Sequence, residues 1–111
     1  MIHLIRSHAT EQQIDEMLQA LGTYIKLAVD IQRDILAGGG ELHADCEELL
    51  LEDGGQQEDI WGADWSPQTQ TVTFEALINI RPGQGNRSMM ILDASVRERV
   101  ADIVRSMLGG L

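Results

Sequence analysis

Hydrophobic and polar residues follow two different periods along this chain, and each change of period marks a predicted element. Residues 1–6 form a short apolar run that predicts a strand. Thr10 and Gln13 have the spacing of a capping box, in which two side chains satisfy free amide groups at the start of a helix. Apolar residues at intervals of three and four then predict a helix that ends at Gly22, because glycine adopts the left-handed conformation of a helix cap without steric cost.

The period changes to two after this helix. Between Ile25 and Ile31 every second residue is apolar, which predicts a strand with one face in solvent, and the pattern can continue to Ile35. Three glycines at 38–40 are predicted to end the strand, since they favour a turn over any regular element. Residues 41–53 then predict a second helix, since their apolar residues recur on one helical face: Leu42, Cys46, Leu49 and Leu50. A cysteine within such a face is expected to be a buried thiol with a raised pKa.

The second half of the chain contains the clearest strand pattern. Residues 59–63 predict a strand that carries Trp61, and the Ser-Pro pair at 66–67 predicts a turn. In residues 71–80 alternate positions are apolar and predict a strand with one apolar face: Val72, Phe74, Ala76, Ile78 and Ile80. The glycine-rich segment 81–87 predicts a loop by its composition.

The C-terminal residues complete the predicted order. Residues 88–92 are apolar on both faces and predict a short strand near the centre of a sheet. A last helix is predicted to begin after Asp93 or Ser95 and to end at the glycines 109–110. The order β-α-β-α-β-β-β-α predicts the α+β class. We expect one two-layer domain over residues 1–111, with three helices on a mostly antiparallel sheet of about four or five strands.

The length and composition indicate a single domain with a strong negative charge. The 111 residues suffice for one domain with a core, and the single cysteine excludes an internal disulfide and fits a reducing compartment. Eighteen acidic residues against eight Lys and Arg give a net charge of −10, which argues against nucleic acid and anionic membranes as partners. No apolar run approaches the roughly 20 residues of a membrane span, and the N-terminus lacks the apolar core of a signal peptide. We therefore expect a cytoplasmic protein.

The negative charge is concentrated in the middle of the chain. Between Arg33 and Arg81 there is no Lys or Arg, whereas eleven Asp and Glu lie in this interval. Such a concentration indicates either a solvated acidic surface or a site.

The segment 41–53 holds the candidate metal ligands. As a helix it places His43 and Glu47 on one flank of its apolar face, and it places three more carboxylates on the opposite flank: Asp45, Glu48 and Glu52. As an extended segment it projects His43, Asp45 and Glu47 from one face, although the apolar pattern favours the helix. In either form an imidazole with carboxylates could hold a divalent ion such as Mn²⁺ or Zn²⁺. The alternative is a solvated surface on which His43 only pairs with Glu47.

The loop 81–87 is the second candidate site. Its glycines and Asn86 tolerate positive φ, so the backbone amides could turn inward and bind an anion between Arg81 and Arg87. Arginine binds carboxylate and phosphate with two parallel hydrogen bonds. The alternative is a hairpin turn whose arginines pair with the protein's own acidic residues.

Two tryptophans complete the candidate residues. We expect Trp61 in the core, whereas Trp65 beside the predicted turn could line a pocket or a dimer contact. Either indole could also form a small-molecule pocket with the glycine-rich loop.

The motifs ELHADCEELLLEDG, QEDIWGADW and INIRPGQGNRSM resemble those of a family of small bacterial and archaeal proteins of unknown function. The resemblance extends from about Tyr24 to the final helix. It implies a compact, cytoplasmic single domain and assigns no activity, substrate or cofactor. If the motif residues form a site, these are the candidate residues: His43, Asp45, Glu47, Glu52, Asp53, Gln57, Trp61, Arg81, Asn86 and Arg87.

The sequence supports two hypotheses of function. The first is a non-catalytic binding or interaction module that forms a homo-oligomer and binds a protein or a small anionic ligand. In its simplest form Arg81 and Arg87 dock against the acidic helix, within one subunit or across a dimer. The second is a metal-dependent hydrolase or phosphotransfer enzyme, in which His43 and neighbouring carboxylates hold Mn²⁺ or Zn²⁺ and the two arginines clamp an anionic substrate.

Overall fold

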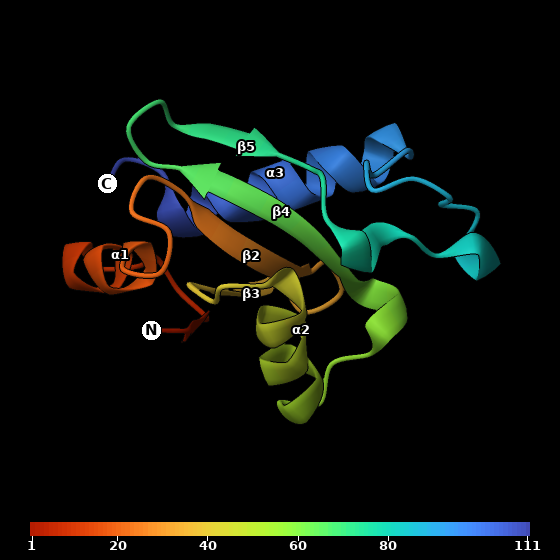
Figure 1. Ribbon diagram of the computed structural model, residues 1–111, viewed down its shortest axis with the longest axis horizontal. Helices are drawn as coiled ribbons and strands as arrows, with labels where there is room; N and C mark the ends of the chain where they lie inside the picture. Colours follow the sequence, from red (N-terminus) through yellow and green to blue (C-terminus); the bar gives the residue numbers. More distant parts are fainter.

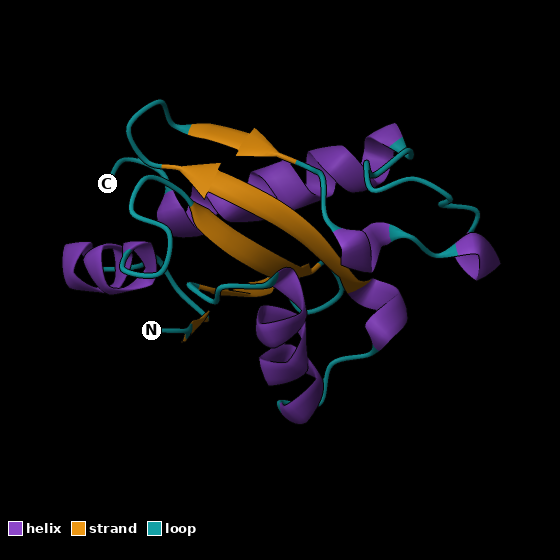
Figure 2. Cartoon of the chain, in the orientation of Figure 1, coloured by secondary structure: helices purple, strands orange, loops and turns teal.

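The computed structural model describes all 111 residues and confirms the α+β class, with a five-stranded antiparallel sheet and three α-helices (Figure 1, Figure 2). The strands lie in the order β1-β3-β2-β4-β5: β1 (His3–Ile5), β2 (Ile25–Asp30), β3 (Ile35–Gly38), β4 (Ile60–Ser66) and β5 (Thr71–Thr73). The helices are α1 (Glu11–Leu18), α2 (His43–Glu52) and α3 (Ala94–Leu108). Three short 3-10 helices join them: η1 (Gln57–Asp59), η2 (Leu77–Asn79) and η3 (Pro82–Gln84). None of the helices has the length and apolar character needed to cross a membrane.

The helices lie on both faces of the sheet. Helices α1 and α3 pack on one face, where Met17 and Val104 belong to the same buried cluster as Leu27 of β2. Helix α2 packs on the other face, where Cys46 forms a smaller cluster with Ala28 and other residues of the sheet. Figure 1 shows α2 in front of the sheet and α3 behind it. The protein therefore has three layers, and the prediction of two layers was wrong.

Strand β2 accounts for this difference. Its alternating pattern predicted a face in solvent, but Ala28 and Asp30 on that face are completely buried. Ala28 is small enough for α2 to approach the sheet closely, and the Asp30 carboxylate is held by hydrogen bonds. Because β2 pairs with β3 on one side and β4 on the other, it is the central strand of the sheet.

The chain turns back between β2 and β3, so the predicted continuation of one strand to Ile35 was wrong. The Asp30 Oδ1 atom accepts two backbone hydrogen bonds within the turn, at 3.0 and 3.1 Å, and Asp34 adopts a positive φ of 59°. Aspartate favours both features. Strand β3 then includes Gly38, which was predicted to break the strand. A Cβ atom there would lie 2.6 Å from Leu27 Cδ2, so a larger residue would displace a buried side chain.

The segment 74–92 contains no regular strand. Only β5 remains of the strand predicted over 71–80, and the strand predicted over 88–92 is reduced to one bridge between Glu75 and Met90. The first prediction holds only for residues 71–73 and the second was wrong, because apolar alternation does not reveal which backbone groups find a partner strand.

Two buried side-chain amides take the place of the missing strand pairing. Asn79 Oδ1 accepts a hydrogen bond from the Gly62 amide at 2.8 Å, and Asn79 Nδ2 donates to the Gly62 carbonyl at 3.0 Å. This side chain thus pairs with β4 as a neighbouring strand would. Asn86 Nδ2 donates to the Asn79 carbonyl at 2.7 Å, and Asn86 Oδ1 accepts from the Leu92 amide at 2.9 Å.

The helix starts agree largely with prediction. The capping box of Thr10 and Gln13 is present at the start of α1. Helix α2 forms within the predicted range 41–53. Of the two caps considered for α3, Asp93 accepts the free amides and Ser95 lies inside the helix.

Candidate functional site

Helix α2 forms as predicted and separates the candidate metal ligands. His43 Nε2 lies 2.8 Å from Asp64 Oδ1 on β4, and Glu47 Oε2 lies 3.2 Å from Arg81 Nη2. Asp45 is exposed, and the other carboxylates of its flank are exposed as well: Glu48 and Glu52. No three His, Cys, Asp or Glu side chains come close enough together to hold a metal ion. The predicted set of His43, Asp45 and Glu47 is not formed, because the helix directs its members to different surroundings.

The Arg81 guanidinium is fully engaged inside the protein. Nε donates to the Ile78 carbonyl at 2.9 Å, and Nη1 donates to the Gln57 carbonyl at 2.6 Å. Nη2 donates to Glu47 and to the Ile60 carbonyl. The guanidinium carbon also lies 4.9 Å from the centre of the Trp61 ring.

The anion clamp predicted for Arg81 and Arg87 is not formed. Arg81 has an acceptor for each of its three nitrogens, whereas Arg87 is exposed and makes no ion pair. The loop amides of Gln84, Gly85 and Asn86 donate to carbonyls of the same loop, so they do not form an open anion site. Arg81 alone docks against the acidic helix within one subunit, whereas the first hypothesis had Arg87 dock there as well.

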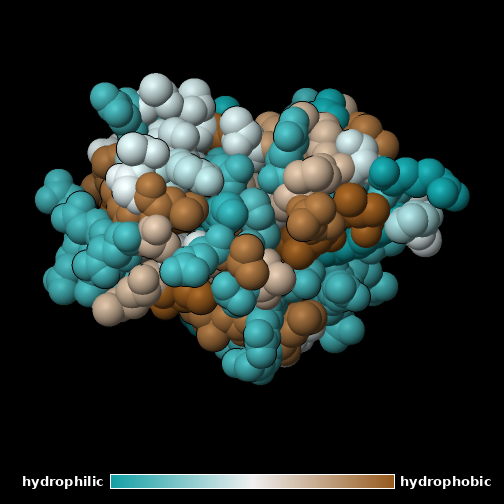
Figure 3. Space-filling model, viewed as in Figure 1, coloured by the Kyte–Doolittle hydropathy of each residue, from teal (hydrophilic) through white to brown (hydrophobic).

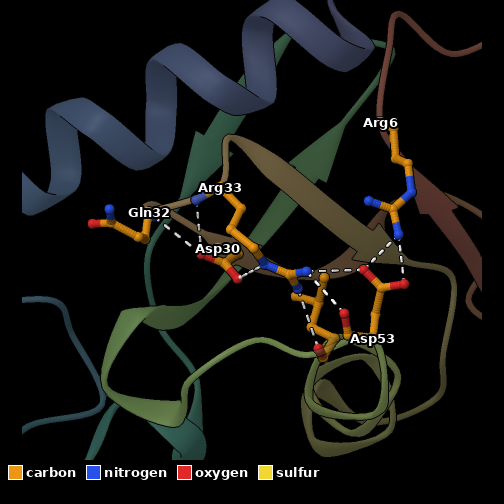
Figure 4. Close-up of polar contacts among 6 residues, drawn as sticks. Arg6, Asp30, Gln32, Arg33 and Asp53 are labelled. Atoms are coloured by element: carbon orange, nitrogen blue, oxygen red, sulfur yellow. Dashed lines mark hydrogen bonds and ion pairs between the residues drawn. The ribbon is translucent and has the colours of Figure 1, made fainter.

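Asp53 belongs to a structural network that sequence reasoning missed (Figure 4). Arg33 Nε donates to Asp30 Oδ2 at 2.8 Å, and Arg33 Nη1 donates to Asp53 Oδ2 and to the Asp53 carbonyl, both at 3.0 Å. Arg33 Nη2 donates to the Leu50 carbonyl at 3.3 Å, and Arg6 donates to both carboxylate oxygens of Asp53. The network therefore caps the C-terminus of α2 and joins it to the β2–β3 turn.

Burial and pairing set the pKa values around α2. Burial raises the pKa of Glu47, although Arg81 opposes this effect, and burial lowers the pKa of Arg81 itself. Cys46 is buried, and burial raises the pKa of its thiol to about 11, as the sequence predicted. The hydrogen bond from Arg6 is the main cause that holds the pKa of Asp53 below its usual range.

The largest cavity lies between the first turn of α2 and η2, over strand β4. We call it the α2–η2 cavity; its volume is about 420 Å³ and its lining is mostly apolar. Three apolar side chains that line it remain exposed at its mouth: Leu42 by 58%, Leu77 by 71% and Met89 by 41%. Figure 3 shows hydrophobic side chains gathered beside η2, to the right of the centre of the molecule. An exposed apolar surface around a hollow is typical of a binding site.

The polar groups of this cavity are few. His43 and Asp64 form the pair described above, and Thr73 Oγ donates to the second oxygen of Asp64 at 3.3 Å. Lys26 also lines the cavity and donates to a backbone carbonyl, whereas Glu75 is exposed and makes no ion pair. Of these residues, sequence reasoning selected only His43. Asp64 follows a predicted strand, but nothing in the sequence indicates which helix faces it.

A second cavity, of about 360 Å³, lies between Trp61 and the glycine-rich loop. The structure thus brings Trp61 beside this loop, as one sequence hypothesis required, whereas Trp65 is completely buried in the core. Asn86 lines this cavity too, but its side-chain amide is used by the backbone of the segment 74–92. The remaining candidate, Gln57, is exposed and contributes its carbonyl oxygen to Arg81.

The comparison with known proteins identifies one family. A family model described as Protein of unknown function (DUF5674) matches residues 3–107. No curated protein and no solved structure matches the chain significantly.

Proposed function

Because the chain belongs to the DUF5674 family, for which no function is established, we infer a function from the geometry of its own surface. We propose that the protein is a non-catalytic interaction module that receives an apolar side chain of a partner protein in the α2–η2 cavity. The exposed apolar rim of this cavity is the observation that carries the proposal.

The rim favours a protein over a small molecule. A small ligand is itself mostly buried in its pocket, so it would cover the hollow but leave the outer side chains in water. Leu77 is 71% exposed and Leu42 is 58% exposed, so much of their apolar surface stays uncovered when only the hollow is filled. A partner surface around an inserted anchor covers both the hollow and the rim.

The charge favours a partner with basic residues beside its anchor. The protein carries a net charge of −10, and Glu75 at the cavity is exposed without an ion pair. Opposite charges around an apolar contact accelerate association and select the partner.

The lining also contains no Ser, Thr, Tyr or Cys, so a covalent nucleophile of these types is not available there.

A peptide library displayed on phage and selected on the immobilised protein tests this proposal. Ala44 is exposed and lines the cavity, so Ala44→Trp would fill the hollow without disturbing the core. Leu51→Trp on the same helix is the matched control, because this residue is exposed away from the cavity. We expect selected peptides with an apolar anchor and basic neighbours to lose binding to Ala44→Trp and to keep it with Leu51→Trp. Equal binding to both variants would contradict the proposal.

Sedimentation equilibrium distinguishes a second copy of this chain from a different protein as the partner. If the homo-oligomer expected from the sequence uses this surface, self-association is present in the wild type and absent in Ala44→Trp. A monomer at all concentrations would assign the cavity to a different protein.

A further inference from the structure

We propose that the anchor received by the α2–η2 cavity is an aromatic side chain with an N–H or O–H donor, a tryptophan or tyrosine of the partner, and that this donor hydrogen-bonds to Nδ1 of His43. The inference rests on the proposed function and specifies the chemistry of the anchor.

The hydrogen bonds of His43 determine which ring nitrogen is free. Nε2 lies 2.8 Å from Asp64 Oδ1 and 3.2 Å from the Ala63 carbonyl oxygen. A carboxylate and a carbonyl only accept hydrogen bonds, so Nε2 must carry the hydrogen. In the neutral ring Nδ1 is then an acceptor, and it has no hydrogen-bond partner in the protein. His43 lines the cavity, and no group of the protein uses this acceptor.

The ring is held in a defined orientation. Its carboxylate partner Asp64 also accepts a hydrogen bond from Thr73, and the His43 side chain is only 12% exposed. Because His43 is the first residue of α2 and Asp64 lies on β4, the helix and the sheet together hold the pair. A ligand that donates to Nδ1 therefore meets an acceptor that needs little reorganisation.

The remaining lining selects an aromatic donor over a charged one. Ala76, Leu77 and Ile78 give the cavity an apolar wall, which suits the face of a ring. Lys26 also lines the cavity, and its positive charge disfavours a cation inside the hollow, whereas the exposed Glu75 remains available to basic residues beside the anchor. Tryptophan and tyrosine combine a large apolar surface with one neutral donor, and both are enriched among the anchors of protein interfaces.

Two probes of nearly equal shape test the donor directly. N-acetyl-tryptophan amide carries the indole N–H, whereas N-acetyl-3-(3-benzothienyl)alanine amide has sulfur in its place. Each is titrated into ¹⁵N-labelled wild-type protein while the amide shifts of the residues that line the cavity are followed. We expect the tryptophan probe to bind roughly two- to tenfold more tightly, which corresponds to one net hydrogen bond.

Two control variants follow. His43→Phe should equalise the two affinities, whereas His8→Phe, at an exposed histidine outside the cavity, should keep the preference for the tryptophan probe.

The outcomes separate the two proposals. If both probes shift the cavity residues with equal affinity in the wild type, the role of His43 is refuted and the interaction site stands. If neither probe shifts these residues, the aromatic anchor is refuted, and the peptide selection with Ala44→Trp decides the interaction site separately. The wild-type comparison decides the question even if His43→Phe does not fold.

Discussion

Replacing Arg81 by methionine tests how the irregular segment 74–92 is held on the sheet. The change leaves the Glu47 carboxylate, only 11% exposed, without its cation. Breaking a buried ion pair from one side costs about 3–5 kcal/mol. Three carbonyls also lose a donor, at about 0.5–1.5 kcal/mol each before coupling is considered. We therefore expect Arg81→Met to lower the free energy of unfolding by roughly 4–6 kcal/mol.

Urea unfolding followed by tryptophan fluorescence measures this loss, because Trp61 and Trp65 are both buried. With a slope of about 2 kcal/mol per M, the midpoint should fall by roughly 2–3 M. Arg87→Met is the matched control; this exposed arginine makes no ion pair, so its midpoint should hardly change. A loss below about 1 kcal/mol in Arg81→Met would refute the reasoning.

A second replacement and a change of pH test whether the unpaired Glu47 carboxylate causes the loss of stability. Removing both charges, with Glu47→Leu added to Arg81→Met, should restore part of the stability, since an apolar pair often replaces a buried ion pair without loss. Burial already raises the pKa of Glu47 above its ordinary value of 4.5, and Arg81 is the main group that opposes this rise. A raised folded-state pKa favours folding in acid and loses this contribution as the pH rises through it. The loss of unfolding free energy in Arg81→Met, relative to the wild type, should therefore be smaller at pH 4 than at pH 7.

Three further predictions concern the fold. Asn79→Ala should lower the free energy of unfolding by about 1–3 kcal/mol in urea titrations, because a buried amide of β4 loses its acceptor; an unchanged midpoint would contradict the role of this side chain. Asp53, chiefly through Arg6, and Asp93, chiefly through the Ser95 hydroxyl, have lowered pKa values. Their contribution to stability is present above the ordinary value of 3.8 and is lost as the pH falls through the folded-state values. In acid titrations followed by circular dichroism, Asp93→Asn should therefore depend less on pH than the wild type. Cys46 should react with a thiol reagent only as fast as the protein opens, and rapid reaction of the folded protein at pH 7 would contradict its burial.

Local patterns predicted the elements that local interactions stabilise. The capping box of Thr10 and Gln13, the helix over 41–53 and the cap at Asp93 depend on residues a few positions apart, and all three are present. The β2–β3 turn was missed because Ile31 and Ile35 keep the apolar phase of β2 on both sides of Asp34. The turn is held by Arg33, whose partner Asp53 at the C-terminal end of α2 lies 20 residues further along the chain.

The candidate site shows the same limit. Sequence analysis selected His43 and Arg81 by residue type, and both side chains form hydrogen bonds to distant parts of the chain. Their partners could not be predicted. Asp64 reaches His43 from another layer of the protein, and Glu47 reaches Arg81 across 34 positions. The cavity itself could not be predicted, since Leu77 was assigned to a strand that the Asn79 side chain replaces.

Methyl-labelled NMR spectra of the protein with N-acetyl-tryptophan amide test the central claim most directly. If the α2–η2 cavity receives an aromatic anchor, ring protons of the probe show nuclear Overhauser effects to the methyl groups at its mouth: Leu42, Leu77 and Met89. These effects should disappear in Ala44→Trp and persist in Leu51→Trp. Effects to methyl groups elsewhere, or equal effects in both variants, would contradict the assignment of this cavity as the binding site.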